Sequence, residues 1–183
     1  MNKEDRELPG VRVIQGLVFQ DDRGHLKKPF STHFFSEEEQ GAMNLHFKEI
    51  WFTFSKLNVL RGMHMQIGAA GCAKYVSVLQ GSVTDVLLDL RAESPSFGNY
   101  MSLDLDGGNA TAIYIPEGIA HGYVVRSPSA IVMYAAAAAH DAKSDVGVRW
   151  DSFDFDWGCS DPIVSERDTE LPTVEAFIQG ASR

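Results

Sequence analysis

The chain has 183 residues, 44% of them hydrophobic, and a formal net charge of −9 at pH 7. This length and apolar content predict a single globular domain over residues 1–183 and exclude a disordered chain. The acidic balance argues against a general nucleic-acid-binding surface, although a few arginines can still hold a phosphate group.

Residues 1–7 are charged and contain no apolar stretch, so we expect no signal peptide. No apolar run approaches about 18 residues, which predicts no membrane-spanning helix. Cys72 and Cys159 are too few for a disulfide framework and indicate thiols in a reducing compartment. These features together predict a cytoplasmic protein.

Short apolar runs separated by turn residues indicate β-strands along most of the chain. One run extends from Val11 to Phe19, and an aromatic-rich run extends from Phe47 to Phe54. Two runs that are split by Gln80-Gly81 predict a hairpin. The runs after Phe54 that we expect to be strands are Tyr75–Leu79, Val83–Leu90, Tyr100–Leu105, Thr111–Ile115, Gly122–Val125 and Ile131–Ala137.

Many short strands with frequent turns predict an all-β barrel or sandwich. A short helix is expected over residues 36–41, where Ser36 can cap an acidic first turn, and a second near Thr173. A doubly wound α/β fold would need helices of about ten residues or more between the strands, and the gaps are too short for them.

Two histidines occupy informative positions. His121 completes a Pro-x-Gly-x-x-His pattern that resembles a motif of cupin barrels, and His64 stands where such barrels usually begin a His-x-His pair. Here that pair reads His64-Met65-Gln66, with no Glu at the expected place. Two imidazoles and an amide make a poor transition-metal site. We therefore expect an antiparallel cupin-type jelly-roll barrel without a metal and without a cofactor.

An ordered set of motifs resembles the dTDP-4-dehydrorhamnose 3,5-epimerase family, whose members are cupin-type nucleotide-sugar epimerases. Together the motifs span roughly residues 11–175. In chain order they are Asp22-Arg23-Gly24, Val59 to Gln66, Lys74-Tyr75-Val76, Gly81 to Val86, Asp89-Leu90-Arg91, Ser94 to Gly98, Ile115 to Gly122 and Ser165-Glu166-Arg167-Asp168.

The resemblance implies the catalytic roles. His64 takes the position of the general base, and Asp168 pairs with it, in our expectation at Nδ1. Tyr134 corresponds to the proton donor on the opposite face of the sugar, and Lys74 lies near the C4 oxygen. The C4 ketone acidifies the hydrogens on C3 and C5, so a base, an acid and a cation beside the enolate oxygen suffice for inversion.

The resemblance also implies binding residues and an assembly. Arg61 and Arg23 are expected to bind the diphosphate of a nucleotide-linked 4-keto sugar, with Arg23 reaching a neighbour's pocket in a homodimer. Gln66 and His121 are expected to contact the substrate. The implied activity is inversion at C3, C5 or both, in deoxysugar or surface-polysaccharide biosynthesis.

Several positions depart from the family pattern. Glu49, Trp51 and Thr53 stand where the family carries Gln, Asn and Ser, and Lys28 stands in place of a Glu. A run of alanines and then His140 replaces the Lys-Thr-Thr and tyrosine pair that usually follow the acid. The departures predict the same proton chemistry on a different nucleotide sugar, for example one linked to CDP or GDP.

Other interpretations stay open at this stage. A related barrel could act as a nucleotide-sugar 3,4-ketoisomerase, which moves the carbonyl, or as a non-catalytic cupin that only binds a sugar nucleotide. Taken singly, Tyr134 suits a core position, and Asp168 suits a charged surface loop. Lys74, Arg23 and Arg61 suit solvated positions when considered without their neighbours.

Overall fold

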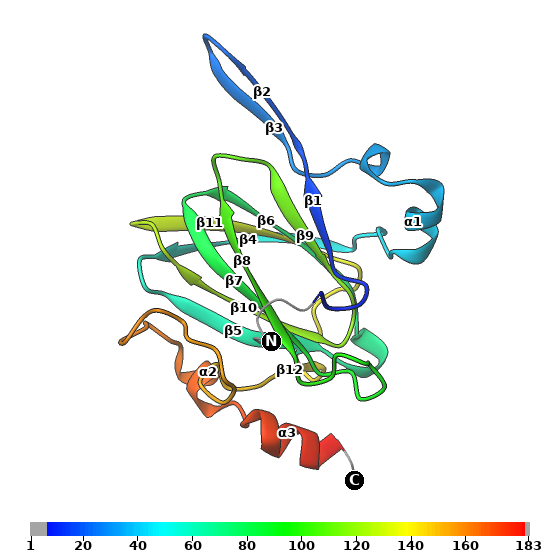
Figure 1. The fold of residues 1–183 in the computed structure, drawn as a ribbon, viewed down its shortest axis with the longest axis vertical. Helices are drawn as coiled ribbons and strands as arrows, with labels where there is room; N and C mark the ends of the chain where they lie inside the picture. The colour runs from blue at the N-terminus through cyan, green and yellow to red at the C-terminus, as the bar shows by residue number, and fades with distance from the viewer. Residues whose placement is uncertain (1–6, 182–183) are drawn as a thin grey trace.

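The computed structural model describes residues 7–181, so residues 1–6 of the charged N-terminal segment lie outside it. Two five-stranded antiparallel sheets face each other and form a cupin-type jelly-roll barrel, which confirms the predicted fold class (Figure 1). The first sheet has the order β1 (Arg12–Gln15), β9 (Thr111–Ile115), β6 (Lys74–Gln80), β11 (Ser129–Ala136) and β4 (Glu49–Lys56). The second has the order β12 (Asp145–Gly147), β5 (Leu60–Gln66), β10 (Ile119–Val125), β7 (Ser82–Asp89) and β8 (Tyr100–Asp106).

The predicted hairpin around Gln80-Gly81 is wrong, because β6 and β7 belong to different sheets. The chain turns from one sheet into the other at Gly81, which has a φ of +76° and is pressed against the backbone of Ser129. Strand β6 pairs with β9 and β11, whereas β7 pairs with β8 and β10. Both runs are largely buried and read as apolar, so their sequence does not distinguish a hairpin from a crossing between sheets.

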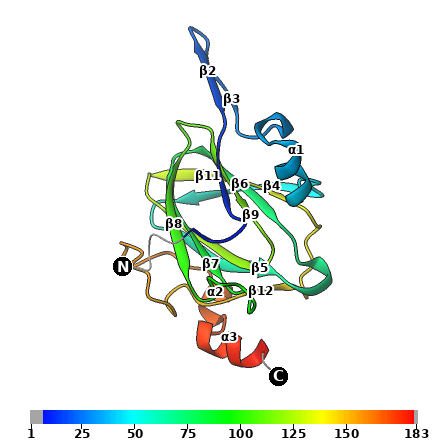
Figure 2. The same cartoon turned by 45° about the vertical axis from the view of Figure 1, so that its right-hand side comes forward.

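The run from Val11 to Phe19 is also divided, at Gly16. There the chain approaches the backbone of Lys28 and Ala110 too closely for any side chain. Strand β1 joins the first sheet, whereas β2 (Leu17–Asp21) pairs only with β3 (Gly24–Lys28). Figures 1 and 2 show this two-stranded hairpin projecting away from the barrel.

Both predicted helices are present, and a third was not predicted. In α1 (Glu37–Ala42), Ser36 and Glu39 form a capping box, which satisfies backbone amides that the first turn leaves free. Helix α3 (Val174–Ala181) begins directly after Thr173. Between them, α2 (Glu166–Glu170) begins at Ser165, which caps it. None of the described helices is long and apolar enough to cross a membrane.

The space between the sheets is filled by apolar side chains at one end and opens into a polar cavity at the other. The core includes Val76, Leu87, Ile113 and Tyr123, all with no exposed surface. Burial of this apolar surface is the main source of the stability of the barrel. The two sheets therefore form a rigid support for the side chains that face the cavity.

Candidate active site

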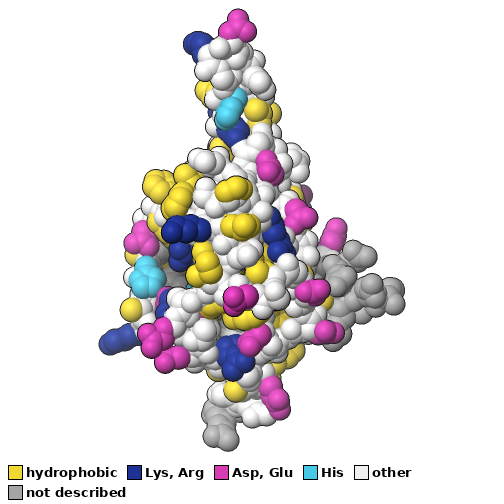
Figure 3. Space-filling view, turned by 90° about the vertical axis from the view of Figure 1, so that its left-hand side faces the viewer, with side chains coloured by type: hydrophobic (Ala, Val, Ile, Leu, Met, Phe, Trp, Pro, Cys, Tyr) yellow, Lys and Arg dark blue, Asp and Glu magenta, His cyan; other side chains and the backbone are white. Residues whose placement is uncertain are grey.

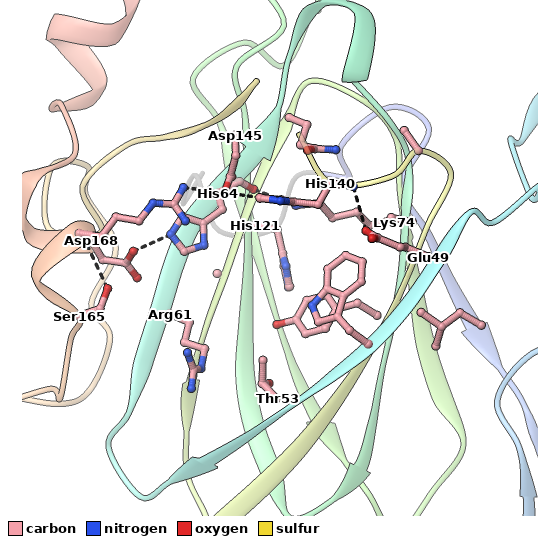
Figure 4. A pocket seen from close by; sticks show the side chains of 18 residues that line it. Glu49, Thr53, Arg61, His64, Lys74, His121, His140, Asp145, Ser165 and Asp168 are labelled. Carbon is pink, nitrogen blue, oxygen red and sulfur yellow. Dashed lines mark hydrogen bonds and ion pairs between the residues drawn. The ribbon is translucent and has the colours of Figure 1, made fainter. Parts of the chain in front are cut away.

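The cavity has a volume of about 500 Å³ and lies between the two sheets and α2. Side chains that the sequence singled out line it from four strands: Arg61, His64 and Gln66 from β5, Lys74 from β6, His121 from β10 and Tyr134 from β11. Asp168 joins them from α2, and Figure 4 shows His64 between Asp168 and the interior. The structure thus brings together residues that are up to about a hundred positions apart in sequence.

His64 and a buried Asp168 form a hydrogen-bonded pair. Nε2 of His64 lies 2.7 Å from Oδ1 of Asp168, whose side chain is only 5% exposed. The backbone amide of Gly62 donates a hydrogen bond of 3.1 Å to Oδ2. Burial opposes ionisation of Asp168, but its hydrogen bonds with His64, Gly62 and Ser165 and the His64 charge outweigh burial and lower its pKa. Asp168 is therefore a carboxylate at neutral pH.

This geometry corrects one expectation. Asp168 binds Nε2 of His64 and not Nδ1, which leaves Nδ1 as the other ring nitrogen. Asp168 is buried on α2 rather than exposed on a loop, as its charged neighbours alone would suggest, because Ser165 starts the helix and accepts a hydrogen bond from the Asp168 backbone amide. The segment before α2 is held along the barrel by Ile163, which exchanges backbone hydrogen bonds with Asn58 and Leu60.

A second histidine–aspartate pair lies deeper. Nε2 of His121 is 2.7 Å from Oδ2 of Asp85, and the two side chains are 4% and 0% exposed. Burial raises the pKa of Asp85, and the charge and hydrogen bond of His121 oppose that rise. Its Oδ1 has no hydrogen-bond partner among the described residues. His121 is thus a fixed wall of the cavity rather than a mobile ligand.

Two glycines allow the two histidine strands to approach. Gly62 has a φ of +130°, and a side chain on it would collide with the Cα atom of Gly122 on β10. The pairing of β5 with β10 has an irregularity here, between His121 and Tyr123. As a result His64 and His121 face each other across the two strands as paired residues.

Tyr134 faces the cavity from the sheet opposite His64. Its ring stacks on Trp51 at a centroid distance of 5.1 Å, with an angle of 3° between the planes. The rings of His121 and Tyr134 lie in an edge-on arrangement, with 5.8 Å between their centroids. Burial first, and then Tyr123 and Asp85, raise the pKa of Tyr134 well above its ordinary value, while Arg61 lowers it. The phenol therefore keeps its proton at neutral pH.

Lys74 is half-buried at the wall of the cavity, and its Nζ lies 3.4 Å from the backbone carbonyl oxygen of His64. Burial lowers the pKa of this ammonium, and Asp145 and Cys72 act in the opposite direction. Lys74 thus loses its proton more readily than an ordinary lysine, and when protonated in this poorly solvated site it interacts strongly with a developing negative charge.

The sequence interpretation missed several polar residues around the same cavity. Arg167 forms an ion pair of 2.8 Å with Asp145, which also contacts His140 at 3.2 Å, and the backbone amide of His140 donates to Glu49. Arg167 belongs to the motif Ser165-Glu166-Arg167-Asp168, so its place beside Asp168 could have indicated that it lies near the cavity. Nothing in the sequence indicated Asp145, because the pairing of β12 with β5 is what brings this residue to the cavity.

The predicted binding residues have different surroundings. Arg61 donates from Nε to Ser55 and borders the cavity. Gln66 lines the cavity, but its amide group bonds to the backbone of Ala70, Ala139 and Asp141. Its contact with a substrate stays a prediction.

Arg23 lies outside this cavity. It sits between β2 and β3 at the tip of the projecting hairpin, where it pairs with Asp21, and its side chain is 89% exposed. The structure does not bring it to the cavity of its own chain.

The expectation of a site without a metal stays a prediction. His64 and His121 are each bound by their own aspartate. Over residues 7–181, no three His, Cys, Asp or Glu side chains are grouped as metal ligands would be.

The sequence and fold match known proteins over almost their full length. The model of the dTDP-4-dehydrorhamnose 3,5-epimerase family matches residues 5–176. The dTDP-4-dehydrorhamnose 3,5-epimerase of Escherichia coli (strain K12) is 33% identical over 182 residues, which cover 98% of this chain and 97% of the relative.

Solved structures agree with that assignment. The dTDP-4-dehydrorhamnose 3,5-epimerase of Elizabethkingia anophelis NUHP1 has a TM-score of 0.84 and 33% identity, covering 93% of this chain and 94% of that one. The dTDP-6-deoxy-D-glucose-3,5-epimerase of Legionella pneumophila Philadelphia 1, in complex with dTDP-4-keto-L-rhamnose, has a TM-score of 0.85 and 27% identity, covering 94% and 92%. Because fold and sequence agree along nearly the whole chain, it belongs to the dTDP-4-dehydrorhamnose 3,5-epimerase family of isomerases.

Proposed function

We propose that this chain inverts C3, C5 or both in a nucleotide-linked 4-keto-6-deoxy sugar, through an enolate. The observation that carries the proposal is the pairing of an ionised Asp168 with His64 on one wall of the cavity, with a protonated Tyr134 on the facing sheet. An acid and a base on opposite walls are what inversion of a carbon next to a ketone requires.

His64 acts as the base through Nδ1. Because Asp168 is a carboxylate, the Nε2 nitrogen that contacts it carries the hydrogen, and Nδ1 has the free lone pair. Nδ1 takes the proton from the carbon beside the ketone, and the electrons of the broken bond form the enolate. Asp168 then stabilises the imidazolium.

Lys74 and Tyr134 complete the reaction. The Lys74 ammonium faces the enolate oxygen and lowers its energy, which the low solvation of that lysine strengthens. Tyr134 then gives its phenolic proton to the carbon from the other side. Its raised pKa suits an acid that must remain protonated until the enolate forms.

The substrate of this chain is a sugar linked to a nucleoside diphosphate. Arg61 and Arg167 border the same cavity as the acid and the base, and guanidinium groups bind diphosphate oxygens well. Glu49, Trp51 and Thr53 line it where the family pattern has Gln, Asn and Ser. These replacements support a nucleotide sugar other than that of the named relatives, with CDP and GDP as the first candidates.

The working assembly is a homodimer of one-domain subunits in the cytoplasm. Strand β4 is an edge strand with Phe52 and Phe54 largely exposed, and the hairpin exposes Phe19 and Leu26. Figure 3 shows hydrophobic side chains on the hairpin and on the barrel beneath it. A second copy covering this surface would receive the hairpin, and Arg23 would then reach the diphosphate in the partner's cavity.

The test is to incubate the protein in D₂O with 4-keto-6-deoxy sugars linked to dTDP, CDP, GDP and UDP. Mass spectrometry follows deuterium uptake, and NMR after reduction of the ketone follows inversion. We expect His64→Asn to lower both by about 10²–10⁴-fold. Tyr134→Phe should keep uptake and lose inversion.

Other outcomes would contradict the proposal. Wild-type uptake of deuterium with a migrated carbonyl identifies a ketoisomerase. Nucleotide-sugar binding without any uptake, measured as thermal stabilisation by the ligand, identifies a binding protein. Inversion that persists at the wild-type rate in His64→Asn would remove that residue from the mechanism.

A further inference from the structure

Trp51 contacts Tyr134, the proposed acid, and the family pattern has Asn at the position of this tryptophan. It stands directly opposite Tyr134 in the pairing of β4 with β11. Directly opposed residues of neighbouring strands place their side chains on the same face of the sheet, here the face toward the cavity. The two rings are nearly parallel, 3° apart in angle and 5.1 Å between centroids.

The Tyr134 ring is thereby held on two sides. Trp51 covers one face of the ring. The His121 ring lies in an edge-on arrangement with it, with 5.8 Å between the ring centroids and 66° between the ring planes. His121 cannot move away easily, because the buried Asp85 binds its Nε2 at 2.7 Å. Tyr134 itself is only 7% exposed. The direction in which the phenolic oxygen approaches a bound sugar is thus fixed by its neighbours.

Trp51 also differs from an ordinary core residue. It is 36% exposed and belongs to the wall of the cavity, whereas the core of the barrel is closed. Its indole is not part of the buried core clusters between the sheets, and it stacks on the face of the proposed acid. We therefore look for the role of this large side chain in the cavity rather than in the core.

We propose that Trp51 is a positioning residue for Tyr134. It sets the fraction of the enolate that is protonated to the inverted sugar rather than back to the starting sugar. This inference rests on the proposed function. The enolate carbon can regain a proton from the His64 imidazolium, which restores the starting sugar, or take the phenolic proton of Tyr134, which inverts the centre. After inversion, the phenolate takes a proton from water and the imidazolium releases one. Trp51 favours inversion by holding the phenol in line.

The experiment compares Trp51→Asn, which removes the stacked ring, with Trp51→Phe, which keeps an aromatic ring opposite Tyr134. Deuterium uptake and inversion are measured in the same D₂O reaction, and the readout is their ratio. We expect Trp51→Asn to keep uptake within about threefold of wild type and to lose inversion by about tenfold or more, a part of the usual effect of an acid. Trp51→Phe should restore most of the inversion.

The matched control is Trp150→Asn, which removes a tryptophan that packs on Trp157 away from the cavity. It should leave the ratio unchanged. If Trp51→Asn does not fold, as judged by circular dichroism, Trp51→Leu gives the same comparison against Trp51→Phe. Equal losses of uptake and inversion in the Trp51 variants, or an unchanged ratio, would overturn the inference alone. A wild-type protein with neither uptake nor inversion on any sugar would overturn the proposed function as well.

Discussion

Lys74 shows how a single side chain is shaped by its surroundings. It reaches from β6 to the backbone of His64 on β5, so its ammonium is held between the two sheets. Burial disfavours the charged form and lowers its pKa. Cys72 and Asp145 act in the opposite direction and favour the charged form of this lysine.

A pH dependence follows from this. Because the Lys74 pKa is lowered, the ammonium is lost at a lower pH than an ordinary lysine would lose it, and the rate should fall as the pH rises through that value. Lys74→Arg keeps a cation that does not titrate in this range. We expect its alkaline limb to lie at higher pH than that of wild type, even where its rate is lower. Steady-state rates between pH 6 and 11 measure this, within roughly the range where lysines titrate. Superimposable alkaline limbs would assign the loss of activity to another group.

At the scale of the element, the loop after β7 depends on one buried carboxylate. Asp89 accepts hydrogen bonds from the guanidinium of Arg91 at 2.7 and 2.9 Å and from the hydroxyls of Ser94 and Ser96. Burial opposes ionisation, but these donors prevail and lower the pKa to about 2. The carboxylate thus fixes the path of the chain from β7 toward β8.

Asp89→Asn should therefore lower stability in a pH-dependent way. The folded-state pKa lies below the ordinary value of 3.8, so the stabilisation is present above that value and is lost as the pH falls toward about 2. We expect the variant to lose on the order of 2 kcal/mol of unfolding free energy at pH 7, and to approach wild type only as the pH falls to about 2. Urea denaturation at several pH values measures the difference. A difference that is constant with pH would show that the charge of Asp89 has no part in it.

Elements also show what the sequence could predict. Ser36 and Thr173 mark helix starts because capping is a local interaction, and β-branched runs mark strands for the same reason. The placement of β6 and β7 in separate sheets could not be predicted, because it depends on partners far away in the chain. The candidate site follows the same division. The motifs identified His64 and Asp168, but the choice of Nε2 is set by how α2 packs on the barrel.

At the scale of the whole molecule, the exposed aromatic face of β4 is a surface that we expect a second subunit to cover. Phe52 is 67% and Phe54 is 63% exposed on an edge strand, an arrangement that natural sheets usually cover. The hairpin projects from the barrel (Figure 2), and it carries exposed apolar side chains of its own. A subunit with these surfaces is suited to pairing with a second copy.

Phe52→Asp should separate the subunits, because a carboxylate in an apolar interface is costly to desolvate. We expect a dimer for wild type and a monomer for the variant in sedimentation at micromolar concentration. Arg23→Ala should leave the dimer intact and weaken nucleotide-sugar binding, by about tenfold if it contacts a phosphate in the partner's cavity. A monomeric wild type, or unchanged binding in Arg23→Ala, would contradict the exchange of hairpins.

The two residues of the proposed base, His64 and Asp168, are separated by 104 positions along the chain. On the ribosome, the strand with His64 emerges well before the capped turn that carries Asp168, so the nascent barrel holds an imidazole without its carboxylate. Closing so long a loop is entropically costly, and it is repaid only when the segment from Ile163 onward docks beside β5. Under the proposed mechanism, the base is therefore completed only late in the maturation of the polypeptide, once this docking step has brought Asp168 to His64.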